Sequence, residues 1–218
     1  MTETQSRILV ADDERNIRKT LSLVLEGAGD EVDVAADGDE ALNLCRERHP
    51  DIAFVDLRMP KMQGLEVLSH IRAISPKTAV VIITAYGTAS NAVEAMKLGA
   101  VDFIQKPFDP KIIEVLAQEI LFRQSLTSIG SFGDYLHLAE LARERNARIE
   151  ARAYLKTAMI RDVSRPEPYY WLGFMAEGDG DKRTALQYYY MAVDANNHFE
   201  PAREALKRLG RLPSEPKE

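Results

Sequence analysis

The fold of this chain is decided by residues 52–60, which read Ile52-Ala53-Phe54-Val55-Asp56-Leu57-Arg58-Met59-Pro60. A short uncharged run that ends at an aspartate and then at a Met-Pro step predicts a strand buried on both faces of a parallel sheet. Asp56 then lies at the carboxyl end of this strand, which is where open α/β sheets place their functional groups. The rest of the chain has to supply the partners of this carboxylate.

Four further apolar runs predict strands at residues 7–11, 32–35, 80–84 and 101–105. Apolar residues recur at helical spacing after each strand, and the last of these helices starts near Pro110. Strands that alternate with helices imply a parallel sheet covered by helices on both faces. We therefore predict an α/β fold for the first part, a doubly wound five-stranded parallel sheet with flavodoxin-like strand order.

Composition places the chain among ordinary globular proteins, with 45% hydrophobic and 28% charged residues among 218. Residues 1–123 carry 14 Lys and Arg against 20 Asp and Glu, so they hold the whole net charge of −6. An acidic domain binds nucleic acid poorly. Cys45 is the only cysteine, and no run is apolar enough for a signal peptide or a membrane span. We expect a cytoplasmic location and no membrane partner.

Asp12 and Asp13 follow the first strand, and a doubly wound sheet brings the ends of its first and third strands together. These two carboxylates should therefore lie near Asp56, where oxygen ligands without thiolate or imidazole suit Mg²⁺. The alternative is that Asp12 and Asp13 only cap the first helix, because Asp is a favoured N-cap residue.

Two more polar side chains end neighbouring strands, Thr84 on the fourth and Lys106 on the fifth. A magnesium ion, an ammonium group and a hydroxyl around one aspartate could hold a phosphoryl group on that aspartate. Pro107 follows Lys106 directly, which makes it a candidate for a cis peptide bond.

These residues carry a family resemblance. Asp12-Asp13, Asp56-Leu-Arg-Met-Pro, Thr84-Ala85 and Lys106-Pro107-Phe108, in this order, resemble the receiver domain of bacterial response regulators over residues 6–123. The stretch Val93-Glu-Ala-Met-Lys-Leu-Gly-Ala-Val-Asp-Phe-Ile-Gln-Lys-Pro-Phe108 is most similar to receivers of the nitrogen-regulation type.

The resemblance implies a role for each matching position. Asp56 would be the phosphoacceptor, and Mg²⁺ would be held by Asp12, Asp13, Asp56 and the backbone carbonyl of Arg58. Lys106 and Thr84 would contact the phosphoryl group, Phe103 would be the aromatic switch residue, and Arg58 and Tyr86 occupy positions that tune dephosphorylation in this family. The phosphoryl donor would be a sensor histidine kinase. We expect no enzyme activity beyond self-catalysed phosphotransfer and autodephosphorylation at Asp56.

The second part predicts helices only and contains an internal repeat of 34 residues. Seven small or large apolar positions recur after 34 residues. The first set is Tyr135, Leu138, Ala139, Ala142, Ala151, Leu155 and Ala158, and the second set is Tyr169, Leu172, Gly173, Ala176, Ala185, Tyr189 and Ala192. This period and pattern resemble two tetratricopeptide repeats, near 132–165 and 166–199, followed by a capping helix through Ala202, Ala205, Leu206 and Leu209. Such arrays bind proteins or peptides.

The predicted organisation is a receiver domain at 1–123, a linker at 124–132, a helical-hairpin repeat domain at 133–212 and a disordered tail at 213–218. The predicted function is that of a two-component response regulator whose output is the binding of an unknown protein or peptide. One alternative is a nucleic-acid-binding regulator that uses Arg143, Arg145, Arg148 and Arg152, although these arginines more often form a solvated face paired with Glu140, Glu144 and Glu150. Another alternative is a constitutive scaffold or a homodimer.

Overall fold

The computed structural model describes residues 5–126 and 130–211. The chain divides into two compact units, Met1–Ser125 and Leu126–Glu218. Within the described residues, no helix combines the length and the apolar character that crossing a membrane requires.

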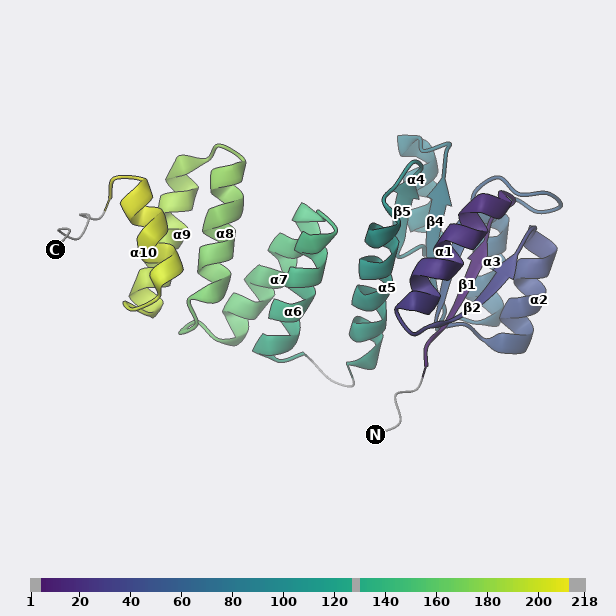
Figure 1. Ribbon diagram of the computed structural model, residues 1–218, viewed down its shortest axis with the longest axis horizontal. Coiled ribbons are helices and arrows are strands. Elements are labelled where there is room, and N and C mark those ends of the chain that lie inside the picture. The colour runs from purple at the N-terminus through teal and green to yellow at the C-terminus, as the bar shows by residue number, and fades with distance from the viewer. Residues whose placement is uncertain (1–4, 127–129, 212–218) are drawn as a thin grey trace. The chain divides into compact units, whose positions relative to one another are not determined.

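The first unit alternates strands and helices along the chain (Figure 1). Its elements are β1 (Arg7–Ala11), α1 (Arg15–Gly27), β2 (Glu31–Ala35), α2 (Gly38–Arg48), β3 (Ile52–Asp56), α3 (Gly64–Ile74), β4 (Ala79–Thr84), α4 (Ala89–Lys97), β5 (Asp102–Gln105) and α5 (Pro110–Ser125). All neighbouring strands are parallel, in the order β2-β1-β3-β4-β5. This order confirms the predicted doubly wound, flavodoxin-like sheet.

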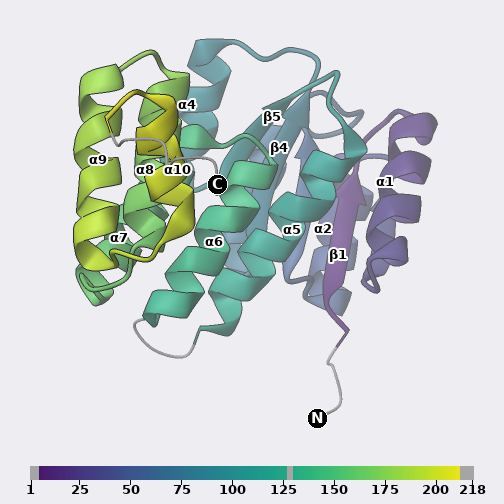
Figure 2. The same ribbon diagram turned by 60° about the vertical axis from the view of Figure 1, so that its left-hand side comes forward.

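Alternate residues of β3 supply the two halves of the core. Ile52 and Phe54 pack with α1 and α5 on one face, while Ala53 and Val55 pack with α2 and α3 on the other face. Figure 2 shows α1 and α5 on the same side of the sheet. All five residues of β3 are buried, including Asp56. This explains why the strand reads as a continuous apolar run rather than as an alternating one.

A glycine allows the chain to fold back against the end of β3. The backbone N–H of Gly64 donates to the carbonyl oxygen of Leu57 at 2.8 Å. A Cβ atom at position 64 would lie 2.1 Å from the carbonyl oxygen of Asp56, which is far inside van der Waals contact. Only glycine therefore permits this close approach, which begins α3 directly beside the carboxyl end of β3.

The second unit is helical throughout its described residues, as the sequence predicted. Its helices are α6 (Phe132–Glu144), α7 (Arg148–Arg161), α8 (Glu167–Gly178), α9 (Lys182–Ala195) and α10 (Glu200–Arg208). Helices α6 and α7 pack as one hairpin and α8 and α9 as another, and α10 packs on α9.

The two hairpins repeat with the predicted offset of 34 residues. Ala151, Leu155 and Ala158 in α7 are fully buried, and so are Ala185, Tyr189 and Ala192 at the matching positions in α9. The turns match too, because Asn146 (φ 60°) and Gly180 (φ 81°) both adopt the left-handed conformation. The repeated sequence pattern therefore reflects a repeated packing arrangement.

The predicted linker can be compared with the end of α5 and the start of α6. Residues Gln124, Ser125 and Phe132 of the expected linker 124–132 are helical. The expected disordered tail 213–218 lies outside the described residues. The limits of the domains themselves stay predictions.

Gly173 provides a test of the close packing between α8 and α9. A Cβ atom at this position would lie 2.8 Å from two ring carbons of Tyr189 and 3.2 Å from the carbonyl oxygen of Ala185. We expect Gly173→Ala to lower the free energy of unfolding of the second unit by roughly 1–3 kcal/mol through overpacking. Trp171 lies in the same helix, so its fluorescence during urea unfolding reports this unit.

Gly178→Ala is the matched control in the same helix. The nearest atom to a Cβ there is Nη2 of Arg148 at 3.7 Å, which is ordinary contact. We expect its stability to be unchanged or slightly raised, because alanine is the better helix former. Equal effects of the two substitutions would contradict the close packing at Gly173.

Candidate functional site

Four polar residues lie at the carboxyl edge of the sheet. Asp12 follows β1, Asp56 ends β3, Thr84 ends β4 and Lys106 follows β5. Asp12 is 2% exposed, Asp56 is 5% exposed and Thr84 is fully buried. The sheet order places these strand ends in a row, so residues up to 94 positions apart in the sequence form one cluster.

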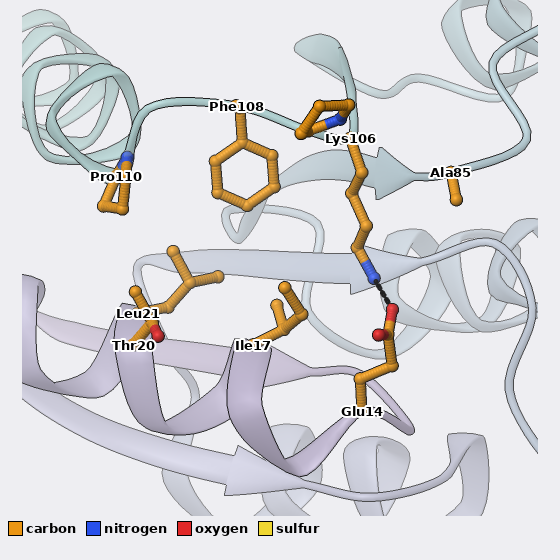
Figure 3. A pocket seen from close by; sticks show the side chains of 9 residues that line it. Glu14, Ile17, Thr20, Leu21, Ala85, Lys106, Phe108 and Pro110 are labelled. Atoms are coloured by element: carbon orange, nitrogen blue, oxygen red, sulfur yellow. Dashed lines mark hydrogen bonds and ion pairs between the residues drawn. The ribbon is translucent and has the colours of Figure 1, made fainter.

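Lys106 is the cation at the centre of this cluster. Its Nζ lies 2.7 Å from Oδ2 of Asp12, 2.9 Å from Oε1 of Glu14 and 3.4 Å from Oδ1 of Asp56. Figure 3 shows the Lys106 side chain extending toward Glu14 from the loop that follows β5. One ammonium group therefore neutralises two buried carboxylates and one exposed carboxylate at the same time.

Glu14 is the site residue that the sequence reasoning missed. Its carboxylate contacts Lys106 although the two residues are 92 positions apart. The available signal was the unbroken acidic run Asp12-Asp13-Glu14, in which one carboxylate oxygen of each residue lies within 4.8 Å of those of the other two. Asp56 is not a member of this group of three, but it contacts the same lysine. The expected ligand set of Asp12, Asp13, Asp56 and the Arg58 carbonyl stays a prediction.

The capping alternative for Asp12 and Asp13 does not describe the start of α1. The N-cap residue is Glu14, which makes no side-chain capping hydrogen bond. Oδ1 of Asp12 instead accepts from the backbone N–H of Glu14 at 2.9 Å. This bond fixes the Asp12 carboxylate in the turn before α1, with Oδ2 directed at Lys106.

Burial and charge act in opposite directions on the acidic groups. Desolvation raises the pKa of Asp12, and the hydrogen bond from Lys106 opposes this effect. Desolvation likewise raises the pKa of Asp56, against the hydrogen bond from the Arg58 backbone and the charge of Lys106. For Lys106, burial lowers the pKa, but hydrogen bonds to Asp12 and Glu14 outweigh burial and raise the pKa above its ordinary value.

The donor set fits a hard divalent cation. Carboxylate oxygens of Asp12, Asp13 and Glu14 lie together, and Asp56 joins them through the shared contact with Lys106. No described cysteine or histidine contributes to the acidic group. Oxygen ligands of this kind are those that Mg²⁺ prefers.

Arg58 and Tyr86 lie in matching positions on two loops. The backbone N–H of Arg58 donates to Oδ2 of Asp56 at 2.8 Å, and that of Tyr86 donates to Oγ1 of Thr84 at 3.1 Å. Their side chains stack, with the guanidinium carbon of Arg58 3.5 Å from the centre of the Tyr86 ring. The sequence suggested a shared tuning role for these two residues but not the stack between them.

The remaining predicted residues lie on β5 and directly after it. Phe103 is half-buried and packs against the core cluster on the α2 and α3 face. The Lys106–Pro107 peptide bond is cis.

A pocket of about 370 Å³ lies next to the lysine. Glu14 and Lys106 line it together with apolar side chains of α1, among them Ile17 and Leu21, and with Phe108 of the loop before α5 (Figure 3).

The buried carboxylate of Asp56 makes a prediction about stability and pH. Because burial raises its pKa, the folded chain binds a proton at Asp56 more readily than the unfolded chain does. The carboxylate therefore lowers stability increasingly as pH rises from the ordinary Asp range through the raised pKa. We expect Asp56→Asn to stabilise β3 at about pH 7, with a gain that shrinks toward about pH 4.

Hydrogen exchange of the β3 and β4 amides, measured in chelator at each pH against the unaltered chain, checks this expectation. Asp13→Asn, which alters an exposed carboxylate in the same cluster, is the control. A gain for Asp56→Asn that does not change with pH would contradict the prediction.

Comparison with known proteins assigns the first unit. The family model for the response regulator receiver domain matches residues 8–118. Regulatory protein AtoC of Escherichia coli (strain K12) is 40% identical over 121 residues, which are 56% of this chain and 26% of AtoC. Transcriptional regulatory protein ResD of Bacillus subtilis (strain 168) is 33% identical over 174 residues, which are 79% of this chain and 71% of ResD.

A solved structure gives the same result. A chain in the crystal structure of the CheX-CheY-BeF3-Mg²⁺ complex from Borrelia burgdorferi is 29% identical, with a TM-score of 0.51, and the match covers 53% of this chain and 89% of that one. The present chain spans only about a quarter of the length of AtoC. Receiver domains bind Mg²⁺, in agreement with the acidic group at Asp12, Asp13 and Glu14.

The sheet order, the acidic group beside Lys106 and the match over residues 8–118 lead to one conclusion. The chain belongs to the response regulator receiver family: its first unit is a receiver domain, a phosphoacceptor signalling module rather than an enzyme, and an all-helical region follows it.

Proposed function

We propose that this protein is a response regulator that a sensor histidine kinase phosphorylates on Asp56, and whose helical unit binds a partner protein. The observation that carries the proposal is the contact of a buried strand-end carboxylate, Asp56, with the Lys106 ammonium, 3.4 Å away. The hairpin repeat supports the second half of the proposal, because repeated helical hairpins form extended binding surfaces.

Four residues would hold the magnesium ion. Their ligands are the carboxylates of Asp12, Asp13 and Asp56 and the backbone carbonyl of Arg58. Bound Mg²⁺ would neutralise charge on the phosphoryl oxygens. Glu14, whose carboxylate lies beside those of Asp12 and Asp13, would add negative charge next to the ion.

The transfer step needs positioning more than covalent assistance. A carboxylate oxygen of Asp56 forms a bond to the phosphorus atom while the bond from phosphorus to the donor histidine nitrogen breaks. That nitrogen keeps the electron pair and takes a proton from solvent. Lys106 stabilises the negative charge of the transferred group, exchanging part of its contact with Asp12 and Glu14 for the phosphoryl oxygens.

Phosphorylation would act on the rest of the receiver by a population shift. The hydroxyl of Thr84 is buried at the end of β4 and would turn to hydrogen-bond the phosphoryl group. Phe103 is half-buried on the neighbouring strand and would move inward with it. This motion would change the surface around α4 and β5.

The helical unit is proposed to be a short tetratricopeptide-like array. The 34-residue offset, the fully buried small residues and the matching turns support this assignment. The closer likeness of the receiver to the nitrogen-regulation type is a further part of the proposal.

Nucleic-acid binding through the arginine-rich helices is the second candidate function. The observation in its favour is that the match to ResD, a transcriptional regulatory protein, extends beyond the receiver. The ion pairs of the helical unit weigh against it. Arg148 and Arg152 both contact the carboxylate of Asp179, which lies between α8 and α9. The partner is therefore Asp179 rather than the acidic residues of α6 and α7 that the sequence suggested. Neutralised arginines contribute little to phosphate binding.

Trp171 offers a direct test, because it is the only tryptophan and lies in α8. We expect its fluorescence to change when Mg²⁺ and beryllofluoride, which stands in for the phosphoryl group, are added to the full chain. Asp56→Ala should abolish the change, because no carboxylate remains to bind the analogue. Phosphoryl transfer to Asp56 is measured separately with a phosphorylated histidine kinase.

A silent Trp171 in a chain that demonstrably binds beryllofluoride would favour the constitutive scaffold. Steep loss of nucleic-acid binding with added salt would favour the nucleic-acid-binding regulator.

The stack of Arg58 on Tyr86 leads to a prediction about phosphoryl lifetime. Both side chains belong to residues whose backbone N–H groups bond to Asp56 and Thr84, so the stack would limit the approach of water to phosphorylated Asp56. An exposed stack of this kind is worth ~0.5–1 kcal/mol. We expect Tyr86→Ala to shorten the lifetime of phosphorylated Asp56 about twofold to fivefold, measured as loss of acid-stable label over time.

Tyr86→Phe keeps the ring and is the control, with an expected lifetime close to that of the unaltered chain. A longer lifetime for Tyr86→Ala would show that the stack assists water instead of excluding it.

A further inference from the structure

Helix α8 carries an aromatic face whose first two rings are partly packed against the core of the helical unit, Trp171 against one cluster of buried residues and Tyr170 against two others. Tyr169, Leu172, Gly173 and Ala176 are buried between α8 and its neighbours, where Gly173 approaches Tyr189 of α9. Tyr170, Trp171 and Phe174 share the remaining side of the helix, at the spacing of one helical turn. Phe174 is 47% exposed, and the other two are half-buried.

These three rings form one continuous surface. The ring centres of Tyr170 and Trp171 are 5.1 Å apart and those of Trp171 and Phe174 are 5.6 Å apart, both in edge-to-face orientation. Phe199, directly before α10, extends the surface, with its ring centre 5.8 Å from that of Tyr170. Rings held by one another in this way are rigid, so a ligand that binds to them orders few side chains.

Arg143 of α6 provides a charge at one edge of this surface. Its guanidinium carbon lies 3.3 Å from the centre of the Trp171 ring. Within residues 5–126 and 130–211, no carboxylate lies at ion-pair distance from it, and desolvation lowers its pKa. Glu140, one turn earlier on α6, is 3.9 Å from His137 instead.

Other arginines of the same unit do have carboxylate partners. Arg165 contacts Glu167 at 2.6 Å, and Arg208 contacts Glu177 at 2.6 Å. Glu177 also accepts a hydrogen bond from Tyr189. The carboxylate of Glu177 is thus neutralised. Arg143 feels the charge of Glu140 but forms no ion pair with a carboxylate in the part of the chain that the structure describes, so its N–H groups can bind an acceptor from outside.

We infer that the aromatic face of Tyr170, Trp171 and Phe174, together with Arg143, binds an extended segment of a partner protein in which an acidic residue lies next to apolar residues. The apolar side chains would pack on the rings, and the carboxylate would pair with the guanidinium, which stacking already holds in place. This inference rests on the proposed protein-binding function of the helical unit and names the chemistry of its partner.

The experiment selects peptides from a random library on the unaltered full chain and measures their affinity by calorimetry and by Trp171 fluorescence. We expect the selected peptides to carry Asp or Glu beside aromatic, aliphatic or proline residues. Phe174→Ala should weaken binding about tenfold, as expected for an anchor residue. Arg143→Gln should lower the affinity for the acidic peptides by a similar factor. It should not lower the affinity for control peptides in which Gln replaces the acidic residue.

Tyr190→Ala, which removes a comparably exposed ring from α9, is the control and should leave affinity unchanged. The inference is overturned if no peptide is selected, if the peptides are basic, or if the Phe174 and Arg143 variants bind as the unaltered chain does. It is also overturned if sedimentation shows a dimer that Phe174→Ala converts to a monomer, because a second copy then occupies this face.

Peptide binding measured with and without beryllofluoride, and in the Asp56→Ala variant, distinguishes failure of this inference from failure of the proposed function. If peptides bind through Arg143 and Phe174 equally in every state of Asp56, the phosphorylation switch fails and the binding face stands. If binding depends on Asp56 but not on these two side chains, the switch stands and the binding face is elsewhere.

Discussion

The contact of one ammonium group with three carboxylates is the constraint on which the receiver depends. Asp12 and Asp56 are almost completely buried, and desolvation raises the pKa of each carboxyl. The charge of Asp12 raises the pKa of Asp56 further, and a neighbouring cation opposes both effects. Lys106 is that cation, and it reaches them only because β3, β4 and β5 are neighbours in register. The sheet is therefore the scaffold of the site, and the close approach at Gly64 begins α3 directly beside the end of β3.

Much of this arrangement could be predicted from sequence because it follows from the backbone. An apolar run such as residues 52–55 specifies a buried strand, and a parallel doubly wound sheet then fixes which strand ends meet. Contacts between long side chains that are distant in the sequence could not be predicted in this way. Glu14 contacts Lys106, and Arg58 stacks on Tyr86, through side chains whose rotamers depend on the assembled edge.

The same distinction holds in the helical unit. Its repeat was predictable because close helix packing requires small residues, and Gly173 against Tyr189 leaves no room for a methyl group. The partners of its arginines were not predictable, since Glu144 and Glu150 are nearer to Arg148 in the sequence than Asp179, which lies in a turn 31 residues away. Sequence spacing gives the neighbours along one helix, whereas the turn of the next hairpin becomes a neighbour only after packing.

Phosphorylation of Asp56 can affect the helical unit only if the phosphoryl group interacts more favourably with one conformation of the chain than with another. Under the proposed function, that difference would be concentrated at Lys106, whose contacts with Asp12 and Glu14 would be exchanged in part for contacts with the phosphoryl group. Lys106 lies four residues before α5, and α5 is anchored in the core by Ile113, Leu116 and Ile120 before the chain continues to α6. The shortest covalent route from the acidic site to the second unit therefore runs along one packed helix. A helix held by the core moves as a body, so a small displacement of the loop at Lys106 would be carried along the length of α5 and not absorbed near the site.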